Sequence, residues 1–261
     1  MLYADYPLAD STFADFHVTV APPPNWRRFF RRQVNFGLEG LAPFSPLPRS
    51  QAFPMLEWGM NWCISNHAHS YLMIHAAVLE KNGSAAIFAA PPGSGKSTLC
   101  AGLMLRGWRL LSDELTLVRL DDGQIESVPR PVSLKNASID VIRQFEPSAV
   151  LSPSVRDTVK GTVAHLKPSA DSIVRGMEPA RPGWIIFPQY VAGSAIICEP
   201  VTPSRAMMRA ADNSFNYSVL GQDGFQAMAT LVSQCKSMDF RYSALDDAVQ
   251  FFDHLAQFDP P

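Results

Sequence analysis

The chain is short of several features that would restrict its class. Only four of its 261 residues are cysteines, and none of them has the Cys-x-x-Cys spacing. This scarcity argues against a disulfide framework and a cysteine-based zinc site, so we expect reduced, mostly buried thiols. No apolar run approaches the roughly 20 residues that cross a bilayer, and no charged-then-apolar leader opens the chain. We therefore expect a cytoplasmic protein with no membrane partner.

A large excess of charge of either sign is also missing. The 22 basic and 24 acidic residues leave a formal net charge of −2, so we expect no nucleic-acid partner. The local exception is WRRFFRR at residues 26–32, with four arginines around two phenylalanines. This segment could bind phosphate, but we favour a strand or helix face whose arginines extend into solvent.

Proline-rich breakers mark the first part of the chain. APPPNW and APFSPLPRS interrupt a region in which residues 13–20 and 31–40 predict strands. We predict an amino-terminal β-rich and proline-rich region at residues 1–70, packed on a larger domain at residues 71–261. The apolar stretch that precedes Ser70 has helical spacing and predicts a helix before the larger domain begins.

The larger domain shows both strand and helix patterns. Residues 71–80 and 84–90 predict strands, and residues 224–235 and 243–258 predict core-packing helices. Residues 184–201 predict a β-hairpin, with two apolar runs around Ala-Gly-Ser. In this hairpin the proline at position 188 weakens the first strand or places it at an edge.

A phosphate-binding motif lies between the strand at residues 84–90 and the helix that follows it. Residues 90–97, APPGSGKS, fit the Walker A pattern with alanine in place of its first glycine. An apolar strand leads into the segment, and a helix-forming run leaves it and stops at Gly107. This context favours a P-loop over the simpler alternative, a glycine turn that opens a buried helix.

Each residue type of the motif has a role in binding a nucleoside triphosphate. Two glycines let the backbone curl so that successive N–H groups point at phosphate oxygens, next to the positive end of a helix. Lys96 can reach the β- and γ-phosphates, and the Ser97 hydroxyl can bind Mg²⁺. The predicted nucleotide-binding residues are Gly93, Ser94, Gly95, Lys96, Ser97 and Thr98.

Two acids and a histidine complete the candidate site. Asp113 and Glu114 follow the strand-like segment RLLS, whose carboxyl end would lie beside the phosphate loop if it is a neighbouring strand. One carboxylate there can bind Mg²⁺, and the other can accept a proton from an attacking hydroxyl. The alternatives are two solvated acids at a strand end and, for His75, a satisfied core histidine.

The stretch from His75 to Val118 resembles the core of the HPr kinase/phosphorylases. Both have a histidine, a β-hairpin, a phosphate loop, a helix ending in Arg-Gly, and a hydrophobic strand before two acids. This overlap covers roughly residues 72–118. The closer resemblance is to the bacterial HprK-related kinases and runs from about residue 13 to the end. It is carried by EWGMNWC, GWRLLSDE, RPVSLKNASI and SFNYSVLGQDGF.

The resemblance implies a fold, two cofactors and a set of roles. The fold would be a P-loop kinase core with a mixed α/β sheet, as in phosphoenolpyruvate carboxykinase, and the cofactors would be ATP and Mg²⁺. Lys96 would bind phosphate, Ser97 and Asp113 would bind Mg²⁺, and the chain could assemble as a homo-oligomer. Glu114 falls at the proton-accepting aspartate and His75 at the active-site histidine of the family.

The sequence also departs from that family. Glu114 is one methylene longer than the aspartate that it replaces, and Lys135 stands near the position of a Mg²⁺-binding glutamate. Arg205 and Arg209 are candidate phosphate contacts, with surface arginines as the alternative. The first 70 residues do not resemble the family's amino-terminal domain. With these departures the sequence leaves open whether the phosphorylase activity is retained and whether HPr is the substrate.

Together these patterns predict a kinase that transfers the γ-phosphoryl group of Mg-ATP to a hydroxyl, and the expected acceptor is serine or threonine in a protein or peptide. Two alternatives stay open. One is a nucleotide-binding regulatory module without phosphotransfer, which the lysine at position 135 favours. The other is a small-molecule kinase. The sequence does not identify the phosphoacceptor or the preference between ATP and GTP.

Overall fold

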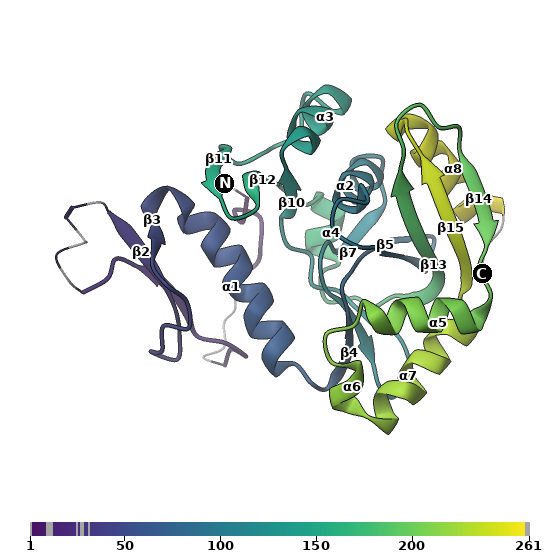
Figure 1. Cartoon of the computed structure of the whole chain (residues 1–261), viewed down its shortest axis with the longest axis horizontal. Helices are drawn as coiled ribbons and strands as arrows, with labels where there is room; N and C mark the ends of the chain where they lie inside the picture. Colours follow the sequence, from purple (N-terminus) through teal and green to yellow (C-terminus); the bar gives the residue numbers. More distant parts are fainter. Residues whose placement is uncertain (1, 9–12, 25, 27–28, 31, 259–261) are drawn as a thin grey trace.

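A mixed six-stranded sheet forms the centre of the structure, a computed structural model that describes residues 2–8, 13–24, 26, 29–30 and 32–258 (Figure 1). The strands are, in spatial order, β14 (Ile197–Pro200), β15 (Lys236–Tyr242), β13 (Arg181–Tyr190), β6 (Ser84–Ala89), β5 (Ala76–Lys81) and β7 (Arg109–Ser112). β13 pairs in parallel with β6 and β15, and the other neighbours are antiparallel. The prediction of an α/β fold with a mixed sheet is confirmed.

The two faces of this sheet are covered by different helices. Alternating residues along each strand point to opposite faces, so Phe88 and Ile87 of β6 belong to separate apolar clusters. α2 (Lys96–Leu105) and α8 (Leu245–Phe258) cover the first face, and α5 (Pro203–Asp212) and α7 (Gln222–Ser233) cover the second. A short helix, α6 (Tyr217–Leu220), leads into α7. The two predicted carboxyl-terminal helices are thus present and packed on the core.

Two smaller antiparallel sheets flank the central one. The first contains β4 (Tyr71–Ile74), β8 (Thr116–Arg119) and β9 (Ile125–Glu126). The second contains β10 (Val132–Lys135), β12 (Gly161–Leu166) and β11 (Val155–Thr158), with α3 (Ala137–Phe145) following β10 and α4 (Ala170–Val174) following β12. The strand predicted at residues 71–80 is therefore divided at His75, because β4 pairs with β8 whereas β5 pairs with β6 and β7.

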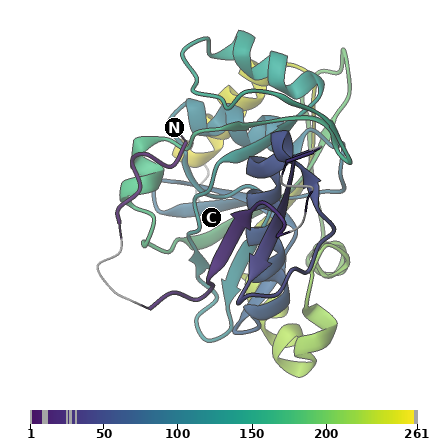
Figure 2. The same cartoon turned by 90° about the vertical axis from the view of Figure 1, so that its left-hand side faces the viewer.

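The amino-terminal region forms a third small sheet and a long helix (Figures 1 and 2). The sheet contains β1 (Val18–Ala21), β2 (Gln33–Leu38) and β3 (Leu47–Pro48), and a 3-10 turn at Arg49–Gln51 leads into α1 (Ala52–His67). Phe36 and Met55 are central to a separate apolar cluster here. In Figure 1 α1 lies between this sheet and the rest of the molecule. Most arginines of WRRFFRR, at positions 27, 28 and 31, lie outside the described residues.

The prediction of a hairpin at residues 184–201 is wrong. Both strands form, but β15 lies between β13 and β14, and β14 pairs with β15 alone. Pro188 consequently occupies a strand with neighbours on both sides. The Tyr190 backbone N–H donates to Ser94 O (2.9 Å), which lies just beyond β6. Because backbone nitrogens two residues apart face the same side of a strand, the nitrogen of Pro188 also faces that side, where the pairing of β13 with β6 has already ended. A missing donor therefore breaks no ladder bond at that position.

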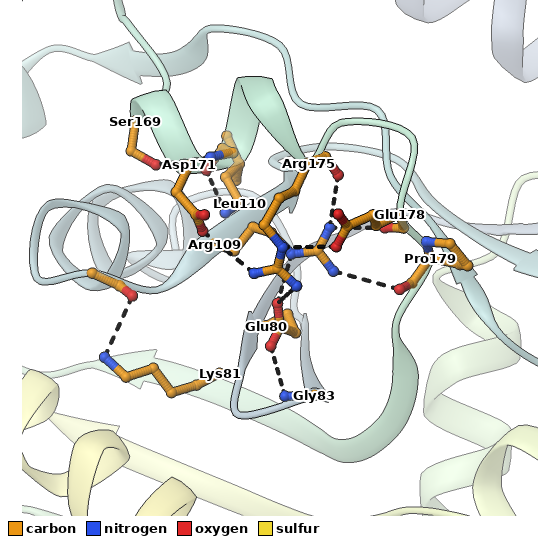
Figure 3. A network of polar contacts seen from close by, with 12 residues as sticks. Glu80, Lys81, Gly83, Arg109, Leu110, Ser169, Asp171, Arg175, Glu178 and Pro179 are labelled. Atoms are coloured by element: carbon orange, nitrogen blue, oxygen red, sulfur yellow. Dashed lines mark hydrogen bonds and ion pairs between the residues drawn. The ribbon is translucent and has the colours of Figure 1, made fainter.

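At the end of the sheet opposite to the carboxyl end of β6, a buried ion-pair network holds the strands in place. Figure 3 shows Arg109, at the start of β7, and Arg175 converging on Glu80 near the end of β5. The Arg109 Nε lies 2.6 Å from Glu80 Oε2, and both side chains are at most 5% exposed. Arg109 also donates to the carbonyl oxygens of Arg175 and Glu178. This network links β5 and β7 to the segment after α4.

Among the residues described, none of the helices combines the length and apolar character needed to span a membrane.

Candidate functional site

The loop between β6 and α2 has the backbone geometry of an anion cradle. Gly93 and Gly95 adopt φ values of 87° and 89°, a region that residues with a Cβ rarely occupy. Gly95 is the N-cap of α2 and offers no side chain to cap the helix, so the first N–H groups of α2 are available to a ligand. Neighbouring strands hold the loop in place: the Tyr242 hydroxyl donates to Gly95 O at 3.0 Å.

Lys96 is the first residue of α2 and turns back toward the start of the loop. Its side chain is buried, and its Nζ donates to the carbonyl oxygens of Ala90 (3.3 Å) and His75 (3.5 Å). Burial lowers the pKa of Lys96, whereas the nearby carboxylates of Asp113 and Glu114 act in the opposite direction. The sequence-predicted lysine and both acids therefore share one electrostatic environment.

Asp113 directly follows β7, at the end of the sheet where β6 also ends and the loop begins. β7 is not the immediate neighbour of β6, because β5 separates them, but β5 is antiparallel to both. The carboxyl ends of β6 and β7 consequently reach the same edge. This corrects the expected strand order and preserves the expected proximity.

The Asp113 carboxyl group has a free acceptor atom. Its Oδ2 accepts a hydrogen bond from the Ser133 N–H (3.0 Å), while its buried Oδ1 has no hydrogen-bond partner in the described part of the chain. Burial and, next, the charge of Glu114 raise the pKa of Asp113 to about 6. The nearby Ser97 hydroxyl favours the ionised form of Asp113 and so lowers its pKa, although it forms no hydrogen bond of standard geometry with Asp113 Oδ1. Asp113 is thus ionised above neutral pH and presents one unused oxygen.

This donor set fits Mg²⁺. Within the part of the chain that the structure describes, no three His, Cys, Asp or Glu side chains gather as a metal cage. Mg²⁺ in nucleotide sites uses one or two protein oxygens together with phosphate oxygens and water. A hydroxyl from Ser97 and the unused oxygen of Asp113 meet that need.

Glu114 is held as a carboxylate by surrounding donors. Asn61 of α1 donates to its Oε2 at 2.6 Å, and the Nζ atoms of Lys135 and Lys160 lie 3.8 and 3.9 Å from its Oε1. Burial alone would raise the pKa of Glu114, but Lys160 and Lys135 outweigh it and lower the pKa. The carboxylate therefore stays ionised across the neutral range.

His75 is a neutral imidazole in this site. Burial and the adjacent Lys96 charge lower the pKa of His75 to about 4, and its ring packs against Phe215 with centroids 5.6 Å apart. The backbone N–H of His75 donates to Asn213 O (2.7 Å) at the break between β4 and β5. At neutral pH the side chain can exchange hydrogen bonds but carries no charge.

Of the remaining predicted residues, some lie at the loop or beside the acid pair and others lie away from both. Ser94 lies in the loop with a buried hydroxyl that has no partner in the described region, and Thr98 lies in the first turn of α2. Arg205 is exposed on α5, and Arg209 on the same helix pairs with Asp239 rather than with any residue of the acid pair. Lys135, in contrast, does reach Glu114.

Several residues around the acids were missed from the sequence. Lys160 comes from the turn between β11 and β12, and its Nζ lies 5.2 Å from the centroid of the Trp58 ring of α1. Arg130 donates to Asn61 Oδ1 and pairs with Glu57. Lys160 lies in none of the segments that carry the family resemblance, but Glu57, Trp58 and Asn61 lie in EWGMNWC and Arg130 begins RPVSLKNASI. Those two segments were the available signal, together with the four-residue spacing that places Glu57 and Asn61 on one helix face.

A polar cavity of about 20 Å³ lies between α1 and the acids. Four of its lining residues present buried polar atoms without a partner in the described chain: Trp58 Nε1, Asp113 Oδ1, Ser133 Oγ and His165 Nε2. The volume suits one water molecule or one small polar group, and the surrounding donors and acceptors can satisfy it. Helix α1 is therefore part of the site and not only a connection to the amino-terminal sheet.

Comparison with known proteins finds a family match over part of the chain and a distant similarity to a solved structure. A family model described as "SynChlorMet cassette protein ScmC" matches residues 53–160, less than half of the chain. No curated protein matches. A solved structure, the Hpr(Ser) kinase/phosphatase from Coxiella burnetii, is 10% identical, with 72% of this chain and 98% of that chain covered and a TM-score of 0.34.

Proposed function

We propose that the protein is a P-loop kinase that transfers the γ-phosphoryl group of Mg-ATP to a hydroxyl, with serine or threonine of a protein or peptide as the acceptor. The observation that carries the proposal is the convergence at one sheet edge of a glycine loop, Lys96, and the two carboxylates of Asp113 and Glu114. Phosphoryl transfer needs little beyond this: positioning, charge neutralisation and a proton acceptor.

The phosphate groups would be bound mainly by fixed positive groups. The uncapped N–H groups of α2 and the Lys96 ammonium would contact the β- and γ-phosphates. Two further cations lie nearby: Lys135 is within electrostatic reach of Lys96, and Lys160 is within reach of both acids, so the three lysines outnumber the acid pair. Ser97 and Asp113 would hold Mg²⁺, which neutralises phosphate charge and orients the γ-phosphoryl group.

Glu114 would accept the proton of the attacking hydroxyl. Its low pKa ensures that it is ionised at neutral pH, and a loose transition state demands only a weak base, because proton loss is late. Neutral His75 would hydrogen-bond near the reacting groups without adding a competing charge. The catalytic set is Glu114, Asp113, His75 and Lys96.

A nucleotide-binding regulatory module remains a second candidate for a specific reason. Two lysines and Asn61 already occupy the oxygens of Glu114, and a carboxylate held in this way is a poor proton acceptor unless a ligand displaces them. A small-molecule kinase is a third candidate, because α1 covers the acids and leaves the side chain of Glu114 only 18% exposed, which would suit a small acceptor.

The test is transfer of label from γ-labelled ATP with Mg²⁺ into a dephosphorylated lysate of the source organism. We expect a labelled species with the wild type that is lost with Lys96→Ala and with Glu114→Gln. Lys81→Ala, which removes a lysine at the opposite sheet edge, should behave as wild type. Binding of ATP without any transfer of label would overturn the kinase proposal in favour of the regulatory module.

A further inference from the structure

A second and larger cavity borders the loop before α2, on the side away from the acid pair. It has a volume of about 540 Å³, within the range of small-molecule sites. Its walls are Pro91, Gly93 and Ser94 of the loop together with the ends of β13 and β15. These strands lie on the opposite side of β6 from β5 and β7, and therefore from the acid pair.

The cavity lies on the opposite side of the loop from the end of β7, where Asp113 stands. A nucleotide bound at the loop would direct its γ-phosphate toward the lysine and the acid at the end of β7. The nucleoside would then extend past the loop in the other direction, toward β13 and β15. The 540 Å³ cavity lies along that direction and shares the loop residues Gly93 and Ser94 with the phosphate cradle.

One wall of the cavity carries a flat cation that is fixed on two sides. Arg209 of α5 places its guanidinium carbon 3.6 Å from the centroid of the Phe187 ring, and its Nη1 lies 2.6 Å from Asp239 Oδ1. The ring of Phe187 supports one face of the guanidinium and the carboxylate holds its edge. About a third of the Arg209 side chain stays exposed, and all three residues line the cavity.

We propose that this cavity binds the base of the nucleotide and that Arg209 is the platform on which the base stacks. A guanidinium plane stacks well on aromatic surfaces, and purines offer the larger area, so purine nucleotides are the preferred class. Phe187 and Asp239 are positioning residues, because they keep the guanidinium plane in one orientation. This inference rests on the proposed function and adds the residues that recognise the nucleoside.

The experiment separates base binding from phosphate binding. Isothermal titration measures the affinity of the full chain for Mg-ATP and for Mg-tripolyphosphate, which lacks the nucleoside. Arg209→Ala is expected to weaken Mg-ATP binding at least tenfold and to leave tripolyphosphate binding within twofold of wild type. Arg209→Lys, which keeps the charge and loses the plane, should resemble Arg209→Ala. Arg143→Ala, at an exposed and remote arginine of α3, is the matched control and should leave both affinities unchanged.

Phe187→Leu provides a second variant that keeps most of the buried volume and removes the supporting ring. It should weaken Mg-ATP binding and spare tripolyphosphate binding, with an unchanged thermal unfolding profile as the check on folding. The inference is overturned if Arg209→Ala binds Mg-ATP as tightly as wild type, or if it loses affinity equally for both ligands. A wild type that binds neither ligand would overturn the proposed function as well, so the two failures are distinguishable.

Discussion

Asp113 combines a cost to stability with a role in the proposed chemistry. Its pKa is about 6 in the folded protein, against an ordinary value near 3.9. Between these values the folded state binds more protons than the unfolded state, so the free energy of unfolding falls as the pH rises through that window. The full penalty, on the order of 3 kcal/mol for two pKa units, is present above pH 6.

Asp113→Asn should therefore stabilise the protein while removing its function. Asparagine can still accept the Ser133 N–H bond and carries no charge to bury. We expect a higher free energy of unfolding than wild type at pH 8, a much smaller gain near pH 4, and loss of Mg-ATP turnover. Urea unfolding at both pH values checks this. A variant that is less stable than wild type at pH 8 would contradict the burial penalty assigned to Asp113.

Single residues were the most predictable scale of this site. Lys96, Ser97, Asp113 and Glu114 are predictable because a phosphate loop constrains which residue types stand next to it, whereas the role of His75 follows from the family resemblance. These residues do lie within electrostatic reach of one another. Lys160 and Asn61 were missed because their roles depend on the packing of distant segments. No local spacing encodes the approach of α1 to the end of β7.

At the scale of elements, the loop before α2 offers a matched pair of substitutions. Gly93 and Gly95 both need a positive φ, but a Cβ at Gly93 would meet open space, whereas one at Gly95 would lie 2.6 Å from the Tyr242 hydroxyl. Gly93→Ala should cost about 1–2 kcal/mol of stability, and Gly95→Ala should cost more and also weaken Mg-ATP binding more. Thermal unfolding and titration of both variants test the order. Equal effects would show that contact with Tyr242 does not fix the loop.

The buried network at the opposite edge predicts a large effect on stability. Glu80→Gln removes the charged partner of Arg109, whose side chain is only 2% exposed, and leaves an uncompensated buried cation. A cost of about 3 kcal/mol is expected. Glu146→Gln breaks the exposed pair with Arg106 and should cost far less than Glu80→Gln, because solvent screens the exposed pair. Urea unfolding of the two variants compares them, and similar costs would contradict the structural role of Glu80.

The elements themselves were predicted better than their pairing. The strand at β6, the helix α2 and the two carboxyl-terminal helices follow from local apolar periodicity. The hairpin at residues 184–201 was wrong because β15, whose residues begin 35 positions after the hairpin, inserts between its two strands. Alternation identifies a strand but does not say which neighbour it takes, so nonlocal insertions are invisible to it.

At the scale of the whole molecule, the division at residue 70 stays a prediction with a defined test. Helix α1 supplies Asn61 to Glu114 and Glu57 to Arg130, and the ring of Phe53 packs edge-on against His165 with centroids 5.0 Å apart. Residues 71–261 expressed alone should therefore unfold at a lower urea concentration than the full chain. An unchanged midpoint would show that residues 1–70 are an independent appendage.

The central claim is that the loop at residues 90–95 binds Mg-ATP, and its most direct test is isothermal titration of the full chain. The wild type should bind Mg-ATP with a measurable affinity. Lys96→Ala should lose at least 2.7 kcal/mol of binding free energy, roughly a hundredfold, and Lys81→Ala should bind within twofold of wild type. Absence of binding by the wild type, or equal affinity for wild type and Lys96→Ala, would contradict the account.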